Sequence, residues 1–253
     1  MSAGAADRGT PGPGGGRTYG ESFADVYELA YHFKDYAADV AYLMAAIRSR
    51  HPGPASLLEV AAGTGRYLEL FQRDIPDVEG LDLSAPMLER AAARVPAARL
   101  HVADMATFDT GRSYDVVCCL FRSIAYCGSV ARLHAAIGSM ARHLAPGGLL
   151  LIEPFFTPDT YRVGDVTMNE ARRGDFRLAW MYVAEREGRL GRLRIHYLAG
   201  TPAGVRHFEE LHELGLFSRA DFESAFAAAG LSLEFDAGGP GATGLYIGRR
   251  IDR

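Results

Sequence analysis

Apolar side chains recur at every third or fourth position over residues 19–50, which is the spacing of an amphipathic helix. Phe23, Tyr27 and Tyr31 follow one another at intervals of four, so they share one face. A His-Pro-Gly-Pro sequence at positions 51–54 ends the pattern, because proline and glycine interrupt regular structure. We therefore predict helical structure up to residue 50.

Beyond this break, short apolar runs alternate with segments of helical spacing. The predicted strands cover residues 56–60, 78–83, 100–102, 115–121 and 149–153. The predicted helices begin near residue 65 and cover residues 85–94 and 130–144. Strands that alternate with helices in this way form an open, mostly parallel sheet with helices on both faces.

The pattern changes after Glu153. Antiparallel strands are predicted at residues 176–183, 190–198 and 205–216. A helix over residues 218–229 and two strands at 231–235 and 244–248 then complete a sheet of seven strands. We therefore predict a single α/β domain of Rossmann-like type.

The domain is expected to span residues 19–253. Residues 155–217 would form an antiparallel insertion over the carboxyl edge of the sheet, where such folds bind ligands. Residues 1–18 are rich in Gly, Ala and Pro and are predicted to form a disordered tail.

Bulk composition excludes several classes of function. The formal net charge of -4 argues against a nucleic-acid partner. No apolar run is long enough to span a membrane. Cys118, Cys119 and Cys127 do not form a disulfide pattern, which fits a reduced cytoplasmic compartment. His207 and His212 are an odd number of residues apart, so a regular strand directs them to opposite faces, and we predict no metal site.

Three acidic residues follow three successive strands. Glu59 precedes a glycine-rich loop that ends at Gly65, Asp82 follows the second strand and Asp104 the third. An open parallel sheet places all three on one edge, where carboxylates can accept from ribose hydroxyls and an adenine amino group. A dinucleotide site would need a third glycine where Leu68 stands. The set therefore favours a nucleoside joined to an amino acid.

With these motifs, the sequence resembles the class I S-adenosylmethionine-dependent methyltransferases. More specifically, it resembles the N,N-dimethyltransferases of TDP-linked amino sugars such as desosamine and mycaminose, and also the lincosamide N-methyltransferases. The matching stretches are residues 34–36, 56–65, 78–84, 103–105, 141–148, 195–198, 206–208, 216–217 and 225–230. The resemblance implies S-adenosylmethionine as the methyl donor and a homo-oligomer, either a dimer or a larger assembly.

The resemblance also implies a set of cofactor contacts. The family's contacts fall on Tyr36, Glu59, Ala61, Gly63, Asp82, Met87, Asp104, Met105 and Leu120. We add Tyr27, Gly65, Arg66 and Leu83, which adjoin these positions, to the predicted cofactor site.

A second set of residues is expected to face the acceptor. Tyr19, Tyr27 and Tyr126 are the catalytic candidates, and Tyr126 stands where many family members carry a histidine. The predicted substrate-binding residues are Tyr19, Arg122, Ser123, Tyr126, Phe155 and Phe156. Besides Tyr126, three of these positions differ from the family pattern: Arg122 replaces a serine, and Phe155 and Phe156 replace a tryptophan pair. Thr243 stands where the family has an arginine that can help to hold a diphosphate.

The predicted reaction is methyl transfer to the amine of an amino sugar, either TDP-linked or part of an antibiotic intermediate. The tyrosines are expected to position the amine, because a phenol near its reference pKa is a poor base at neutral pH. A lincosamide-type amine and methylation of oxygen remain alternatives, and a non-catalytic cofactor-binding protein is a third.

Overall fold

The computed structural model describes residues 26–241 and 243–250, so the predicted tail and Tyr19 lie outside the described residues. In the described part of the stretch predicted to be helical, residues 26–50, there are two helices, α2 (Tyr27–Ala30) and α3 (Tyr36–Arg48). That prediction was wrong between them. Asp35 begins α3 by accepting the Ala38 N–H at 2.9 Å, and this N-cap sets a new helix start that periodicity alone does not reveal.

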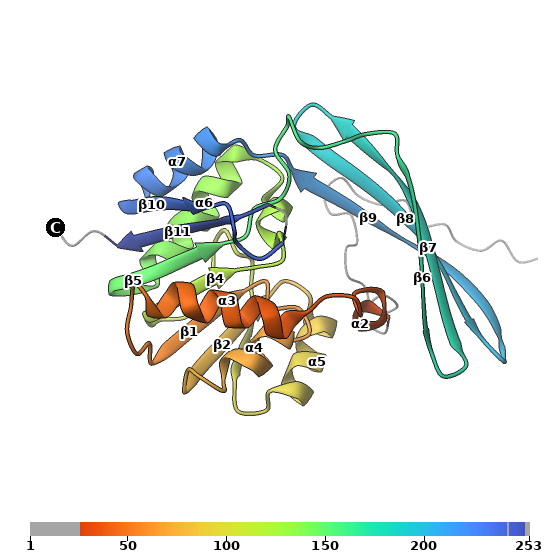
Figure 1. The fold of residues 1–253 in the computed structure, drawn as a ribbon, viewed down its shortest axis with the longest axis horizontal. Coiled ribbons are helices and arrows are strands. Elements are labelled where there is room, and N and C mark those ends of the chain that lie inside the picture. The colour runs from red at the N-terminus through yellow and green to blue at the C-terminus, as the bar shows by residue number, and fades with distance from the viewer. Residues whose placement is uncertain (1–25, 242, 251–253) are drawn as a thin grey trace, which may run out of the picture.

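Seven strands form the main sheet in the order β10-β11-β5-β4-β1-β2-β3 (Figure 1). They are β1 (Ser56–Val60), β2 (Asp77–Asp82), β3 (Arg99–Val102), β4 (Tyr114–Cys119), β5 (Leu144–Ile152), β10 (Leu231–Asp236) and β11 (Leu245–Arg250). Neighbouring pairs from β3 to β5 are parallel, whereas β11 runs antiparallel to both β5 and β10. The predicted mostly parallel, Rossmann-like sheet is confirmed.

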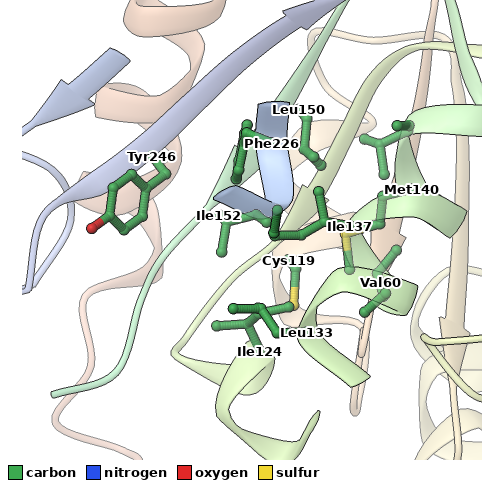
Figure 2. Packing of buried hydrophobic residues seen from close by; sticks show 14 of the residues in the cluster. Val60, Cys119, Ile124, Leu133, Ile137, Met140, Leu150, Ile152, Phe226 and Tyr246 are labelled. Atoms are coloured by element: carbon green, nitrogen blue, oxygen red, sulfur yellow. The ribbon is translucent and has the colours of Figure 1, made fainter. Parts of the chain in front are cut away.

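Helices cover both faces of this sheet. They are α4 (Arg66–Phe71), α5 (Ala85–Arg94), α6 (Val130–Arg142) and α7 (Arg219–Ala228), with the short 3-10 helix η1 (Ser123–Cys127) before α6. Helices α3, α4 and α5 lie on one side of the sheet, and α6 and α7 lie on the other (Figure 1). Ile137 of α6 and Phe226 of α7 pack with Cys119 and Leu150 in a core without exposed side chains (Figure 2). The continuous apolar runs therefore reflect strands buried on both faces.

Four further strands form a separate antiparallel sheet between β5 and α7. They are β6 (Val166–Arg173), β7 (Phe176–Glu187), β8 (Leu190–Thr201) and β9 (Gly204–Gly215), hydrogen-bonded in that order. The sequence prediction lacked β6, because only Ala171 of its eight residues is buried and no alternation marks it. Apolar residues of this sheet, among them Trp180 and Tyr197, pack against Leu29 of α2 and Met87 of α5. The insertion is thus attached to the main domain at the cofactor side.

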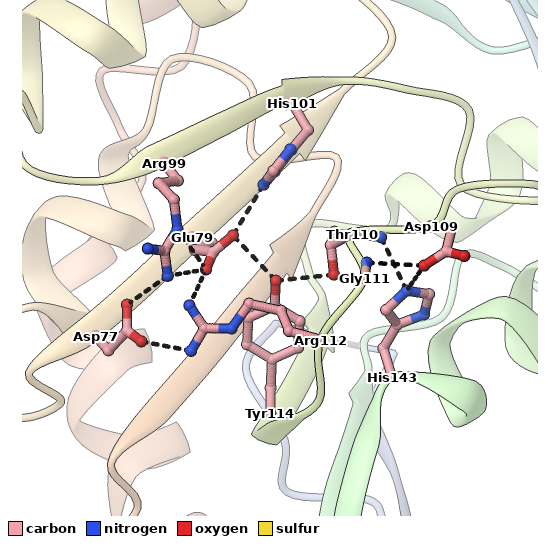
Figure 3. Close-up of polar contacts among 10 residues, drawn as sticks. All are labelled: Asp77, Glu79, Arg99, His101, Asp109, Thr110, Gly111, Arg112, Tyr114 and His143. Atoms are coloured by element: carbon pink, nitrogen blue, oxygen red, sulfur yellow. Dashed lines mark hydrogen bonds and ion pairs between the residues drawn. The ribbon is translucent and has the colours of Figure 1, made fainter.

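An ion network around one buried glutamate joins three strands of the main sheet (Figure 3). Glu79 of β2 is 1% exposed and pairs with Arg99 of β3 and with Arg112 just before β4. Its second oxygen accepts from the Tyr114 hydroxyl at 3.0 Å and lies 2.8 Å from His101 Nε2. A buried charge is tolerated only when it is paired in this way, so the network holds β2 in place next to β3.

None of the helices in the described part of the chain is long and apolar enough to cross a membrane.

Candidate active site

Two adjoining cavities open at the carboxyl ends of β1, β2, β3 and β4. The larger has a volume of about 790 Å³, and the smaller has a volume of about 30 Å³. Tyr27, Ala61, Gly63 and Ser123 line both, so the two cavities meet there. The larger one falls within the roughly 300–1,000 Å³ that is typical of small-molecule sites. Its place beside β1 and β4, where the strand order reverses, is where open α/β sheets bind ligands.

The glycine-rich loop between β1 and α4 has a left-handed backbone at three positions. Ala61, Gly63 and Gly65 have φ values of 61°, 56° and 75°. A side chain on Gly65 would put its Cβ 3.0 Å from the Cβ of Ala91, so Gly65 allows α4 and α5 to approach closely. Gly65 lines neither cavity, so its observed role is in packing, and its predicted cofactor contact stays a prediction.

The smaller cavity pairs a carboxylate with a guanidinium. Glu59 is 2% exposed, and its Oε2 has no hydrogen-bond partner among the described residues. Burial, followed by the nearby charge of Asp82, raises the pKa of Glu59 well above its usual value. The Arg66 guanidinium lies 5.2 Å from the centre of the Tyr36 ring on the same wall. Leu120 adds an apolar side chain to this wall. The Glu59 carboxylate and the Arg66 guanidinium together complement the ammonium and carboxylate of an amino acid.

Asp82, at the end of β2, is held by backbone donors. The Ser84 N–H donates to Oδ1 at 2.8 Å, and the Gly63 N–H donates to Oδ2 at 2.9 Å. The Leu83 N–H is a further backbone donor to this carboxylate. A carboxylate can accept about four hydrogen bonds, so acceptor capacity remains for a ligand. Burial raises the pKa of Asp82 even against these bonds. Such a carboxylate suits a pair of neighbouring hydroxyl groups.

The far end of the larger cavity contains the remaining predicted cofactor residues, Leu83, Met87, Asp104 and Met105. Both oxygens of Asp104 accept hydrogen bonds from Nη2 of Arg132, at 2.9 and 2.8 Å, and one of them also accepts the Ala106 N–H. Burial opposes ionisation, yet these two donors lower the pKa of Asp104 below its usual value. Sequence reasoning missed Arg132, since an arginine in the first turn of α6 carries no signal of a role at another strand's end.

The loop that follows β4 contains two non-glycine residues in the left-handed region, Phe121 (φ 50°) and Arg122 (φ 63°). Glu153 at the end of β5 accepts the Phe121 N–H at 2.7 Å and thereby holds this turn. The Arg122 guanidinium lies 5.3 Å from the Phe156 ring centre, and its Nε is 3.8 Å from Glu153. Arg122, Phe155 and Phe156 line neither cavity, whereas Ser123 lines both. The structure therefore separates these predicted substrate residues from the cofactor cavities.

Tyr126 of η1 lines the larger cavity and is hydrogen-bonded to His212 of β9 at 2.7 Å. The insertion adds three residues to the same wall: Leu190, Leu211 and Glu213. Nothing in their spacing marked them, because they are ordinary members of alternating strands. The cavity wall opposite the glycine-rich loop therefore comes partly from the insertion.

Comparisons with known proteins agree with this geometry. Residues 57–148 match the family model described as a methyltransferase domain. The chain is 42% identical to the dTDP-3-amino-3,4,6-trideoxy-alpha-D-glucopyranose N,N-dimethyltransferase of Streptomyces venezuelae, over 91% of this chain and 98% of the relative. The chain belongs to the family of amino-sugar N,N-dimethyltransferases. It is an S-adenosylmethionine-dependent N-methyltransferase, and S-adenosylmethionine is its methyl donor, as predicted.

Solved structures place this N-methyltransferase in the same family. CalS10, an amino pentose methyltransferase from Micromonospora echinaspora solved with bound S-adenosylmethionine, is 38% identical, with a TM-score of 0.83. The alignment covers 89% of this chain and 97% of CalS10. The sugar N-methyltransferase KedS8 from Streptoalloteichus sp. is 36% identical, with a TM-score of 0.86, over 100% of this chain and 99% of KedS8.

The cavities of the N-methyltransferase fit the donor that its family uses. Glu59 Oε2 is a buried acceptor with no hydrogen-bond partner among the described residues, and the ammonium of a methionine moiety would supply a donor for it. The remaining lone pairs of Asp82 suit the two ribose hydroxyls. Two buried carboxylates with raised pKa values also favour a cationic ligand, and the sulfonium is one.

Three residues of the insertion lie apart from this site. His196, His207 and Glu209 are exposed on β8 and β9, and their donor atoms lie within 4.8 Å of one another. None of the three lines either cavity. His212 is buried, so it does lie on the opposite face from His207, as the spacing predicted.

Proposed function

We propose that the enzyme dimethylates the amine of a TDP-linked amino sugar. The observation that carries this proposal is the 42% identity over 98% of a relative named for a dTDP-3-amino sugar. The alignment includes the insertion that forms the wall of the larger cavity, so it covers acceptor-side as well as donor-side residues.

In this proposal, Glu59 and Arg66 hold the amino-acid end of the donor, Asp82 the ribose and Asp104 the adenine amino group. When bound, S-adenosylmethionine supplies a methyl group on a sulfonium, which is already activated toward a neutral amine. The remaining task of the protein is to align the amine with that methyl group and to exclude water.

In this proposal, the acceptor amine lies beside Tyr27, Ser123 and Tyr126. Tyr27 and Ser123 line both cavities, and Tyr126 lines the larger one. The new bond joins nitrogen to the methyl carbon, the carbon–sulfur bond breaks, and its electron pair remains on sulfur. The methylated ammonium then releases one proton to water before a second round. Tyr19 lies outside the described residues, and its catalytic role stays a prediction.

Arg122 is proposed to hold the diphosphate of the acceptor. Its Nη2 would lie 3.4 Å from a Cβ placed on Gly241, so the guanidinium adjoins the loop that contains Thr243. Position 243 lacks the family's arginine, and the Arg122 guanidinium provides a positive charge next to the same loop. Phe156, which lies against the guanidinium, and Phe155, whose ring contacts that of Phe156, would then flank the diphosphate. Arg122→Ser is expected to raise the KM for the nucleotide-linked sugar and to leave that for the same sugar without nucleotide unchanged.

Mass spectrometry of a panel of acceptors tests the proposal. TDP-linked amino sugars, the same sugars without nucleotide and a lincosamide-type amine are incubated with enzyme and donor. A gain of two methyl groups on TDP-linked sugars alone is the expected result. Methylation of only the nucleotide-free amines would overturn the assignment of the acceptor. The predicted homo-oligomer stays a prediction, which light scattering of the purified protein tests.

A further inference from the structure

A buried histidine lies directly behind the tyrosine that faces the acceptor. His212 of β9 is 3% exposed, and its Nδ1 is 2.7 Å from the hydroxyl oxygen of Tyr126. The two rings are tilted by 50°, with centres 6.1 Å apart. Tyr126 lines the larger cavity and His212 does not, so this hydrogen bond links His212 to the cavity.

The chemistry of the pair indicates which group donates. Burial lowers the pKa of His212 to about 4, so its imidazole is neutral at neutral pH and carries one N–H. An unprotonated imidazole nitrogen is a much stronger base than a phenol oxygen, and a phenol is the stronger acid. The favoured arrangement therefore has the Tyr126 hydroxyl donating to Nδ1, with the imidazole proton on Nε2.

This arrangement has a consequence for the cavity. A phenol has one hydrogen to donate, and here that hydrogen is used by His212. The Tyr126 oxygen then meets an amine as an acceptor of an N–H rather than as a donor. Without His212, the hydroxyl hydrogen is no longer held by Nδ1, and it can donate to the amine lone pair that has to attack the methyl group.

We propose that His212 is a positioning residue, which fixes the Tyr126 hydroxyl so that it accepts an N–H of the acceptor amine and leaves the nitrogen lone pair directed at the methyl group. The proposal rests on the proposed function, because it requires an amine beside Tyr126. It assigns no proton uptake to His212, whose burial keeps it neutral.

A double-mutant cycle tests this role. His212→Leu is expected to lower kcat roughly tenfold, the effect of losing one uncharged hydrogen bond. His212→Gln retains an acceptor and should recover most of that loss. In a Tyr126→Phe background, His212→Leu should change kcat no further, since the group on which it acts is gone. The Kd for S-adenosylmethionine should stay within twofold throughout.

A purely structural histidine would give a different result. Its loss would lower kcat by the same factor with or without the Tyr126 hydroxyl, and additivity would overturn the proposal. An unchanged kcat in His212→Leu would overturn it too. His207→Leu, an exposed position on the same strand, is the matched control for the general effect of losing a histidine from β9.

A second measurement does not depend on turnover. Nitrogen-15 NMR of the imidazole should show His212 with Nδ1 unprotonated and Nε2 protonated, and Tyr126→Phe should shift the Nδ1 signal. A proton on Nδ1 in the wild-type enzyme would overturn the proposal. If no amino sugar is methylated by the wild-type enzyme, the proposed function fails while this spectrum still answers the question about His212.

Discussion

Asp82→Asn should weaken the binding of S-adenosylmethionine roughly 10–150-fold. Both oxygens of Asp82 already accept a backbone N–H, from Ser84 and Gly63, and Leu83 is a further backbone donor. The acceptor capacity that remains is assigned to a ribose hydroxyl. Asparagine keeps one of these oxygens and turns an NH₂ group toward a backbone donor. The change therefore removes one charged hydrogen bond to the ligand, worth about 1.5–3 kcal/mol, and each 1.4 kcal/mol is about tenfold in Kd.

Isothermal titration calorimetry with S-adenosylmethionine and with S-adenosylhomocysteine measures this loss. Asp77→Asn is the matched control, because Asp77 is the first residue of the same strand and its ion pairs with Arg99 and Arg112 lie at the opposite end. Melting of each variant without ligand reports any loss of folding. A Kd within twofold of wild type for Asp82→Asn, or an equal loss in Asp77→Asn, would refute the reasoning.

Three further predictions concern single residues. Glu59→Gln should raise the Tm of the ligand-free protein at pH 7, because it removes a buried charge with a raised pKa, and this gain should vanish as the pH falls toward 4.5. The same change should weaken donor binding roughly tenfold or more, because it removes a charged hydrogen bond. A lower Tm at pH 7 would contradict this. Gly63→Ala and Gly65→Ala should both lose about 1–2 kcal/mol of stability, because both positions have a left-handed backbone. Gly65→Ala should lose more through contact with Ala91, whereas the Cβ of Gly63→Ala meets no protein atom within 4 Å and should weaken donor binding more; denaturant melts and calorimetry on both variants would expose the reverse pattern. His212 alone should lower the free energy of unfolding by about 3 kcal/mol as the pH drops from 6.5 to 4, because the unfolded chain binds a proton that the buried imidazole excludes. His212→Gln should remove that part of the pH dependence. Equal slopes of the free energy of unfolding against pH for both proteins would count against it.

The main sheet was predictable from the sequence because its strands are buried on both faces. Runs such as residues 115–121 are continuous in apolar character, and the helices between them have clear spacing. Strand β6 was not predictable, since its side chains are mostly exposed and polar. The separation of α2 from α3 depends on one side-chain cap by Asp35, which competes with an otherwise unbroken helical period.

Donor-side residues were more predictable than acceptor-side residues for a similar reason. Glu59 and Asp82 lie at the carboxyl ends of β1 and β2, and Asp104 follows β3. Topology sets the order of these strand ends along one edge, and all three residues line the cavities. Arg132, Leu211 and His212 come close to them only through tertiary packing of α6 and β9. No short-range spacing records such a contact.

The two walls of the larger cavity come from separate stretches of the chain. Loops within residues 56–132 form the donor wall, and β8 and β9 contribute Leu190, Leu211 and Glu213 to the other. Mutations in the insertion can therefore accumulate with little effect on the donor loops, so acceptor choice can drift during evolution under a constant donor chemistry. Exchange of the β6–β9 segment between family members is thus a direct route to enzymes that transfer the same methyl group to a different amine.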